Sequence, residues 1–374
     1  MALELLEALK RGLSTGDVGD RPAGIEVRLD LEPAGGLPVQ PPSYDGALEI
    51  HPRHIDGGRR DVIELDSVGS SANRLEEVLL DLHRAGDYPL PVSTTTVKPA
   101  TGPPVTISTL EMPHRVFDAW LRLSDAPAGK VKFEASDLGQ ELSLAHEAAL
   151  DPLLETSAHD LLFGVWDSHR KGPHGQVRLG RSLTTSLIGL DPIAQAQFAA
   201  RRDPLNLGEA SDLPKGAKKL SEQGLSSIPP QKRTPSPEAG ERFESLNGGV
   251  SITEARYLGF LSFAALRRLG FDRYDATEAR VLLASLGLYA LTLRAGDGWD
   301  LRSRCALIPK GDLQLTLVGS TGEREAFTLS TEEAKGLFSD AVAQVGIIDR
   351  RVDLRAGETL DELVSKAVAA GGGE

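Results

Sequence analysis

The stretch Asp61–Arg84, DVIELDSVGSSANRLEEVLLDLHR, decides the fold. Val62–Val68 is rich in β-branched residues and alternates, which predicts a strand. Gly69–Ser71 then predicts a tight turn, and a helix follows. Its apolar residues recur at helical spacing and form one face. They are Leu75, Val78, Leu79 and Leu82.

The ends of this helix carry their own signals. Asn73 and Glu76 have the spacing of a capping box, and Gly86 ends the helix. The free backbone amides of such a helix start, with Ser70, Ser71 and Arg74 around them, form a natural seat for a phosphate. Taken alone, the same residues equally describe a capped amphipathic helix that packs on a sheet.

Composition describes an ordinary globular chain with enough residues for a sizeable core. It has 374 residues, of which 40% are hydrophobic and 25% charged. No apolar run is long enough to cross a membrane, and the acidic N-terminal helix is unlike a signal peptide, so we expect a cytoplasmic protein. The net charge of −13 argues against unaided, non-specific nucleic-acid binding, and the single Cys305 excludes a disulfide framework.

Strands and helices mix without a regular alternation. Gly24–Leu31 predicts the first strand, Thr253–Leu269 and Ala276–Leu286 predict helices, and Leu288–Ala295 predicts a strand. The pattern favours a single α+β domain, with helices on one face of a mostly antiparallel sheet.

Two segments interrupt this domain. Residues 85–110 contain a polar, proline-punctuated stretch that predicts a projecting loop or hairpin. Residues 201–250 form an insertion rich in Pro, Ser and Lys without apolar periodicity. A loop of that length is functional or mobile in most compact domains.

Signatures of catalysis and metal binding are missing. The chain has no G-x-x-x-x-G-K-[ST], no G-x-G-x-x-G after a strand and no G-x-S-x-G. His51, His54 and Asp56 could lie together on a loop, as could His169 and His174, but neither set has a convincing fourth ligand. We therefore expect no catalytic residue, metal or cofactor.

The strongest polar cluster is Phe163–Ser182, FGVWDSHRKGPHGQVRLGRS. Four cations accompany one acid, Asp167, and Trp166 adds an aromatic face. Cations beside aromatic rings are typical of grooves that follow a nucleic-acid backbone. An exposed basic hairpin has the same composition.

Several blocks together resemble one known family. DSVGSSANRLE, MPHRVFDA, FGVWDSHR with RLGRSLTTSL, and ATEARVLLASLGLYALTL with LRSRC follow one another in the order found there. The family is the Csb-type RAMP protein of type I-G (formerly I-U) CRISPR systems, the Cas-seven backbone subunit of Cascade. The likeness extends from about Gly24 to Cys305, and its motifs are diffuse.

The resemblance implies a modified RRM-like, ferredoxin-type RAMP core with palm and thumb insertions, either segment being a candidate thumb. It implies a binding protein and no enzyme. Copies would stack head to tail along a CRISPR RNA and present it for pairing with a target DNA strand, beside a large subunit and a cap or processing subunit. No membrane is involved.

The resemblance also implies an RNA-binding surface. The residues that it transfers to the helix start, to MPHR, to the basic cluster and to LRSRC are Ser70, Ser71, Asn73, Arg74, His114, Arg115, His169, Arg170, Lys171, Arg178, Arg181, Arg302 and Arg304.

Two other interpretations stay open. A related RAMP subunit cleaves target RNA and needs an aspartate near the bound strand, for which Asp66, Asp125 and Asp167 are candidates. A small-molecule enzyme is the third reading, and no constellation of residues argues for it.

Overall fold

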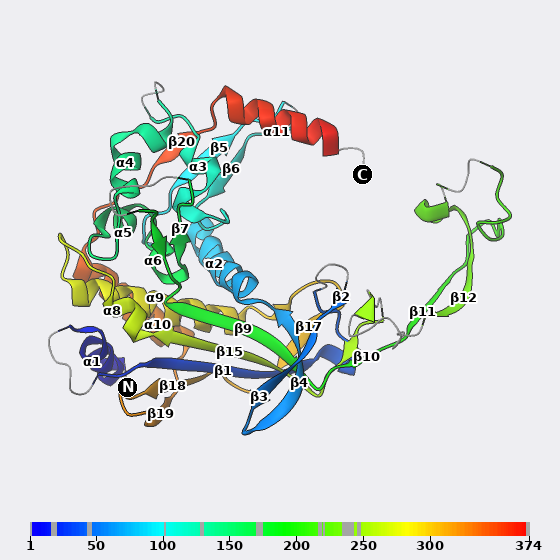
Figure 1. The fold of residues 1–374 in the computed structure, drawn as a ribbon, viewed down its shortest axis with the longest axis horizontal. Helices are drawn as coiled ribbons and strands as arrows, with labels where there is room; N and C mark the ends of the chain where they lie inside the picture. Colours follow the sequence, from blue (N-terminus) through cyan, green and yellow to red (C-terminus); the bar gives the residue numbers. More distant parts are fainter. Residues whose placement is uncertain are drawn as a thin grey trace.

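The computed structural model describes residues 2–15, 21–42, 47–100, 102–127, 131–169, 175–215, 219, 221–233, 243–244 and 248–371. In Figure 1 the body of the protein lies on the left, and a thin arm reaches away from it on the right.

An antiparallel sheet of nine strands forms the centre of the body. Its order is β16-β17-β1-β15-β9-β4-β3, and β18 also pairs with β1 and carries β19 at its outer edge. The strands are β1 (Gly24–Pro33), β3 (Ile50–Ile55), β4 (Gly58–Asp66), β9 (Leu183–Leu190), β15 (Glu254–Ser262), β16 (Trp299–Asp300), β17 (Ala306–Pro309), β18 (Gln314–Val318) and β19 (Arg324–Phe327).

The core of this sheet has the ferredoxin-like βαββαβ topology. Along the chain come β1, the helix α2, β9, β15, the helix α9 and then the β17–β18 segment, whereas in space the order is β17/β18-β1-β15-β9. That is the 4-1-3-2 arrangement of two interleaved β-α-β units. The hairpin of β3 and β4 extends the sheet beyond β9. The expected α+β class and ferredoxin-type core are therefore confirmed.

Strict alternation explains the two faces of the sheet. In β1, Ile25, Val27 and Leu29 are buried, and the residues between them point to the open face. The covering helices pack on the buried face and share one hydrophobic core with it. They are α1 (Ala2–Leu13), α2 (Val68–Ala85), α8 (Phe263–Arg267), α9 (Ala276–Gly296) and α10 (Thr331–Val345).

A helical lobe and a small sheet lie beside α2 (Figure 1). The small sheet has the order β20-β5-β6, and buried Leu90, Val92 and Thr95 tie the hairpin within residues 85–110 to the body. The elements are β5 (Thr94–Val97), β6 (Val105–Ser108), η2 (Arg115–Phe117), α3 (Ala119–Arg122), η3 (Phe133–Ala135), α4 (Asp137–Ser143), α5 (Asp151–Ser157), α6 (Asp160–Phe163), β7 (Val165–Trp166), β8 (Arg178–Leu179), β20 (Asp353–Arg355) and α11 (Glu358–Gly371).

The arm is built from the insertion between β9 and β15. Its two strands, β11 (Gln197–Arg201) and β12 (Ile228–Arg233), pair antiparallel and lead away from the body (Figure 1). The remaining short elements are η1 (Ala34–Gly36), β2 (Ala47–Leu48), β10 (Ile193–Ala194), η4 (Ser221–Leu225), β13 (Phe243–Glu244) and β14 (Val250–Ser251).

Two sequence predictions about the type of an element are wrong. The segment predicted as a helix over Thr253–Leu269 is mostly the strand β15, because its place between β1 and β9 overrides local helix preference. The predicted strand Leu288–Ala295 continues α9, which is apolar on nearly all sides because it is buried on nearly all sides. By length and composition α9 could span a membrane, but 78% of its most apolar window is buried in the protein.

The helix α2 begins earlier than predicted, with its cap six residues before Asn73. Ser67 caps it, accepting a hydrogen bond from the Ser70 amide at 3.2 Å, so Asn73 and Glu76 lie inside the helix and form no capping box. The predicted end is right, since Gly86 adopts a left-handed conformation with φ of 80°.

A fully buried acid in the helical lobe makes stability depend on pH. Burial raises the pKa of Asp160 to about 7, although Arg115 and the Ser157 hydroxyl at 2.7 Å favour its charged form. The unfolded carboxyl has an ordinary pKa of about 3.9. Between these values the folded protein holds a proton that the unfolded chain has lost, so this group weakens the fold as pH rises.

We therefore expect the variant Asp160→Asn to become more stable relative to the wild type as the pH rises. Its free energy of unfolding relative to wild type should increase by up to about 4 kcal/mol between pH 4 and pH 7, which is about three pKa units. The buried neighbour His159, whose pKa burial lowers to about 3, is present in both proteins, so its own contribution cancels. Urea unfolding at several pH values measures this, and a difference that is constant with pH would contradict it.

Candidate nucleic-acid interface

The buried ion pair between Glu76 and Arg115 anchors the region in which the predicted site lies. Arg115 Nε and Nη2 donate to the two carboxylate oxygens of Glu76 at 2.6 and 2.9 Å, and Nη1 donates to the Gly164 carbonyl at 2.9 Å. Arg115 is 6% exposed and Glu76 is 3% exposed. Burial raises the pKa of Glu76, and the Arg115 guanidinium opposes that rise. The prediction that Arg115 lines a groove is wrong, because all of its polar atoms serve the interior.

The two predicted serines at the start of α2 differ in their accessibility to solvent. The Ser71 hydroxyl is buried and lies 2.6 Å from Thr185 Oγ1 on β9, so it cannot seat a phosphate and that prediction is wrong. Ser70 is half-buried and Asn73 is exposed. These two remain accessible from solvent.

Arg74 links neighbouring elements through hydrogen bonds of its side chain. Its Nε donates to Asp66 at 3.1 Å and its Nη2 donates to the Leu301 carbonyl at 2.9 Å. This side chain therefore joins β4, α2 and the loop after β16, and 21% of it is exposed.

The two arginines of LRSRC have a similar role. Arg302 donates to the carbonyls of Gln40 and Leu65, and Arg304 donates to the carbonyl of Gly248 at 3.0 Å. Arg302 thereby links the end of β4 to the loop at Gln40, and Arg304 links the loop after β16 to the segment before β14. A guanidinium engaged with backbone carbonyls has fewer donors left for a ligand.

Ser70, Asn73 and Arg74 do meet in one groove, of about 760 Å³, along the outer face of α2. Its charge is unfavourable to phosphate, because acids outnumber cations on its walls. The acids are Glu76, Glu77, Asp81, Glu111, Asp297 and Asp300, and the cations are Arg74, Arg84 and Arg294. Sequence reasoning missed Arg84, which the helical spacing of α2 could have placed, and Arg294, whose segment was predicted as a strand.

The hairpin of β7 and β8 presents the other part of the predicted surface. Trp166 is 47% exposed, and the Arg178 guanidinium lies 5.7 Å from the centre of its ring. Trp166 and Arg178 are direct partners across the hairpin, which brings their side chains to one face. An aromatic ring with a stacked guanidinium is suited to bases and phosphates of a single strand.

Arg181 is exposed just after this hairpin. Burial of part of its side chain and the nearby Arg115 lower its pKa, and Glu76 raises it, so its guanidinium lies close to the buried pair. Gly164 makes this approach possible: its φ is 82°, and a Cβ there would come within 3.0 Å of the Arg181 amide.

The other predicted residues of this surface are scattered. His114 and His169 are exposed, and the His169 amide donates to Asp167 at 3.1 Å. Arg170 and Lys171, and also His174, lie outside the described residues. The structure therefore brings together Trp166 and Arg178 across the β7–β8 hairpin, and the exposed Arg181 follows β8 and lies against Gly164. We call these three residues the hairpin patch.

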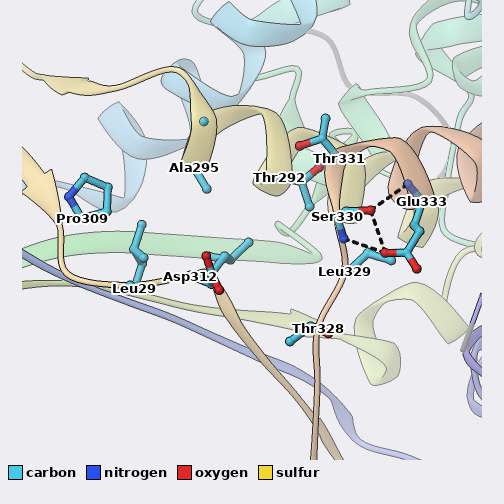
Figure 2. Close-up of a pocket in the computed structure, with 13 residues that line it drawn as sticks. Leu29, Thr292, Ala295, Pro309, Asp312, Thr328, Leu329, Ser330, Thr331 and Glu333 are labelled. Atoms are coloured by element: carbon cyan, nitrogen blue, oxygen red, sulfur yellow. Dashed lines mark hydrogen bonds between the residues drawn. The ribbon is translucent and has the colours of Figure 1, made fainter.

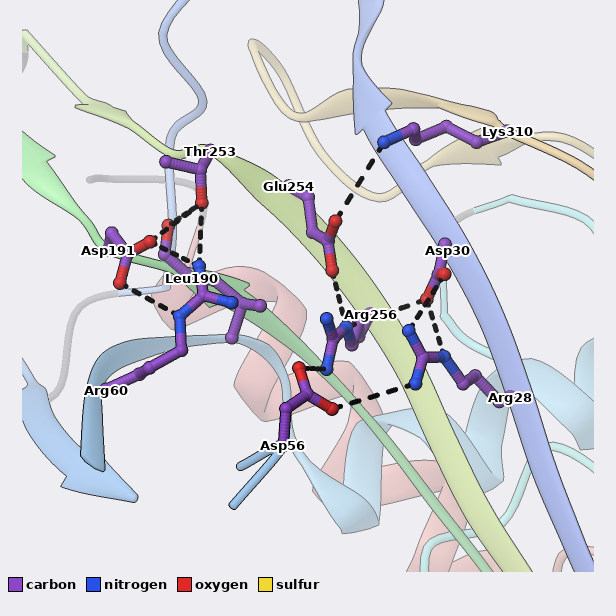
Figure 3. A network of polar contacts seen from close by, with 10 residues as sticks. All are labelled: Arg28, Asp30, Asp56, Arg60, Leu190, Asp191, Thr253, Glu254, Arg256 and Lys310. Carbon is purple, nitrogen blue, oxygen red and sulfur yellow. Dashed lines mark hydrogen bonds and ion pairs between the residues drawn. The ribbon is translucent and has the colours of Figure 1, made fainter. Parts of the chain in front are cut away.

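The open face of the central sheet carries arginines that sequence reasoning missed (Figure 3). Arg28 donates to Asp30 at 2.9 Å, Arg256 donates to Asp56 at 2.6 Å, and Arg60 pairs with Asp191. The Arg256 guanidinium lowers the pKa of Asp56. The outward position of Arg28 in the predicted strand Gly24–Leu31 could have revealed it, whereas Arg256 lies in the strand β15, which was predicted as a helix.

These ion pairs change what the sheet face can do. Each cation of the network in Figure 3 faces an acid, including Lys310, which lies 3.9 Å from Glu254. RNA-binding sheets of the RRM type present aromatic side chains and free cations on this face. Here the face is close to neutral, so a phosphate backbone gains little from it.

Two further features bear on catalysis and ligands. A hollow of about 430 Å³ lies where α9 ends and α10 begins (Figure 2), but Ser330 and Glu333 in its wall form the reciprocal cap of α10. Among the residues that the structure describes, no three His, Cys, Asp or Glu side chains gather to hold a metal ion.

The aspartates considered for RNA cleavage have structural partners. Asp66 is buried and accepts from Arg74, and Asp125 accepts from Lys132 at 2.7 Å. Asp167 is buried beneath the hairpin patch.

One family model matches part of the chain. The family model described as CRISPR-associated protein GSU0053 matches residues 25–193, somewhat less than half of the chain. No curated protein matches. Among solved structures, the crystal structure of Thermofilum pendens Csc2 is similar at 11% sequence identity, over 93% of this chain and 77% of that chain, with a TM-score of 0.27.

The two classes of arginine make a testable contrast. We expect Arg115→Ala to lower the free energy of unfolding by about 3–5 kcal/mol, because it leaves the buried Glu76 without a partner. Arg178→Ala, on the exposed hairpin patch, should change it by about 0.5 kcal/mol or less. Denaturant unfolding of both variants checks this. Equal losses would show that Arg178 is part of the packed structure or that Arg115 is not.

Proposed function

We propose that this chain is an RNA-binding backbone subunit of a CRISPR surveillance complex, more finely the Csb-type subunit of a type I-G Cascade. It holds CRISPR RNA in the cytoplasm and presents it for pairing with an invading DNA strand. Its partners are copies of itself, a large subunit and a cap or processing subunit. The family match over residues 25–193 supports the CRISPR association, and that segment includes α2 and the hairpin patch.

The hairpin patch is the observation that carries the RNA-binding proposal. Trp166 offers a half-exposed aromatic face with Arg178 stacked on it, and the exposed Arg181 offers a second cation just after the hairpin. Phosphate contacts hold a strand without reading its sequence, and stacking accepts any base. A guide-holding protein requires that combination, because base pairing by the RNA supplies the specificity.

The distribution of charge favours a narrow binding track. With a net charge of −13 and a neutralised sheet face, long-range attraction to RNA is weak, so affinity depends on a few local cations. The groove along α2 has more acids than cations on its walls, so it offers little attraction to phosphates.

We propose binding without catalysis. Of the three candidate cleavage residues, Asp66 and Asp167 are buried, and the partly exposed Asp125 is paired with Lys132. A general base or metal ligand must reach the bound strand. This arrangement supports the binding role over the target-cleaving alternative.

Removing the hairpin patch should weaken RNA binding and flatten its salt dependence. In the triple variant Trp166→Ala, Arg178→Ala and Arg181→Ala, two phosphate contacts are lost, so the log–log salt slope should fall by about 1.4. The loss should be similar for two unrelated single-stranded RNAs. Salt titrations of binding by fluorescence anisotropy measure both quantities.

A matched control is Arg268→Ala, which removes an exposed arginine that faces Glu147 on a different surface. It should leave affinity and slope unchanged. If the triple variant keeps the wild-type slope, or loses affinity for one sequence alone, the RNA does not follow the hairpin patch.

Assembly should follow the length of the RNA. A head-to-tail interface does not close on itself, so copies add until the guide is covered. At low protein concentration and without RNA we expect mostly monomers, and with guides of increasing length we expect mass to rise in steps of one subunit. Light scattering measures this. A closed oligomer of fixed size, formed without RNA, would refute the filament.

A further inference from the structure

An apolar groove of about 1000 Å³ opens between α1 and the ribbon of β18 and β19. Its apolar lining comes from Leu5 on α1 and from Leu315, Leu317 and Phe327 on the ribbon. Its charged residues are mostly acids, namely Glu4, Glu7, Asp312 and Glu325, with Arg11 as the cation.

The groove also has an open strand edge. Among the described strands, β19 pairs with β18 alone, so its other edge presents backbone donors and acceptors. Such an edge, next to apolar side chains, suits an extended segment that adds both backbone hydrogen bonds and side-chain contacts.

The arm has the opposite properties. Its apolar side chains point to solvent: Phe198 is 75% exposed and Leu205 is 78% exposed. The fold holds Leu205 in that position, because Asp203 accepts hydrogen bonds from the amides of Leu205 and Leu207 at 3.0 and 2.9 Å. Residues 196–233 contain seven Lys or Arg against four Asp or Glu.

An arm of this kind is incomplete alone. β11 and β12 pair with each other and with no other described strand, and an isolated two-stranded ribbon is marginally stable in water. Large exposed apolar side chains on a basic ribbon indicate a partner with an apolar, acidic surface. The groove beside α1 is such a surface. In Figure 1 the elements that line it, α1, β18 and β19, lie on the left, whereas the arm reaches away on the right.

We propose that the arm of one copy docks in the groove between α1 and β19 of the next copy, with Phe198 and Leu205 as its apolar anchors. Arm and groove lie on different parts of the chain, so the contact is heterologous and continues from copy to copy. It deepens the head-to-tail assembly of the proposed function by naming the two surfaces that meet, and it rests on that function.

Cysteine cross-linking tests the contact directly, because the chain has one cysteine, Cys305, and it is buried. Ala200 on the arm and Ala326 in the groove are both small and exposed. Copies carrying Ala200→Cys are mixed with copies carrying Ala326→Cys and treated with a short bis-maleimide, with and without single-stranded RNA. We expect a covalent dimer from the mixture and a ladder from the double variant.

Two controls make the result specific. Replacing Ala326→Cys by Leu144→Cys, at an exposed position on a different surface, should leave only background cross-linking. Adding Phe198→Asp to the arm should reduce the yield about tenfold or more, since a central aromatic anchor is lost. A yield equal to the Leu144 control, or one that Phe198→Asp leaves unchanged, overturns the proposal.

RNA retention by the same samples separates the two ideas. Protein that binds RNA and shows no specific cross-link leaves the proposed function standing and removes this contact. A specific cross-link in protein that does not bind RNA keeps the contact and removes the function.

Discussion

The Glu76–Arg115 ion pair is the constraint on which the rest of the structure depends. It joins the middle of α2 to η2, and through the Gly164 carbonyl it reaches the start of the β7–β8 hairpin. Arg115 holds these three elements with its backbone in the left-handed region, at φ of 52°, which is costly for a residue with a side chain. Two buried charges are tolerated only when each is satisfied, so this pair fixes where the helical lobe sits on the ferredoxin-like core.

All three side-chain nitrogens of Arg115 form hydrogen bonds in the interior. Any contact between the outer surface and RNA must therefore come from other residues. The acids along α2 and the paired arginines of the open sheet face leave little free positive charge there. Trp166, Arg178 and Arg181 lie where the hairpin leaves the buried pair, so the same interaction that anchors the lobe also positions the hairpin patch. An acidic protein can in this way remain soluble and still hold a polyanion along a narrow line.

Sequence patterns predicted the parts whose signals are local. The alternation in Gly24–Leu31, the stop at Gly86 and the basic hairpin around Trp166 depend on neighbouring residues, and each is present in the structure. The strand β15 could not be predicted in this way, since its conformation depends on pairing with β1 and β9.

The roles of the arginines were equally hidden. Arg115 and Arg178 look alike in a sequence, yet one faces a glutamate 39 positions away and the other a tryptophan across a hairpin. Only the fold decides which cation is neutralised. A basic cluster in a sequence therefore indicates a nucleic-acid surface less reliably than an exposed aromatic residue with a cation stacked on it.

The role of the arm also depends on surroundings that the local sequence does not show. Within one chain it exposes Phe198 and Leu205 and gains no core of its own, so its conformation contributes little to the stability of the monomer. Its apolar area becomes useful only when a second surface removes it from water, and that gain is available in assembly alone. Under the assembly that we propose, a chain of this kind is monomeric while dilute and polymerises once an RNA brings copies together, because the RNA supplies the effective concentration that a weak contact lacks.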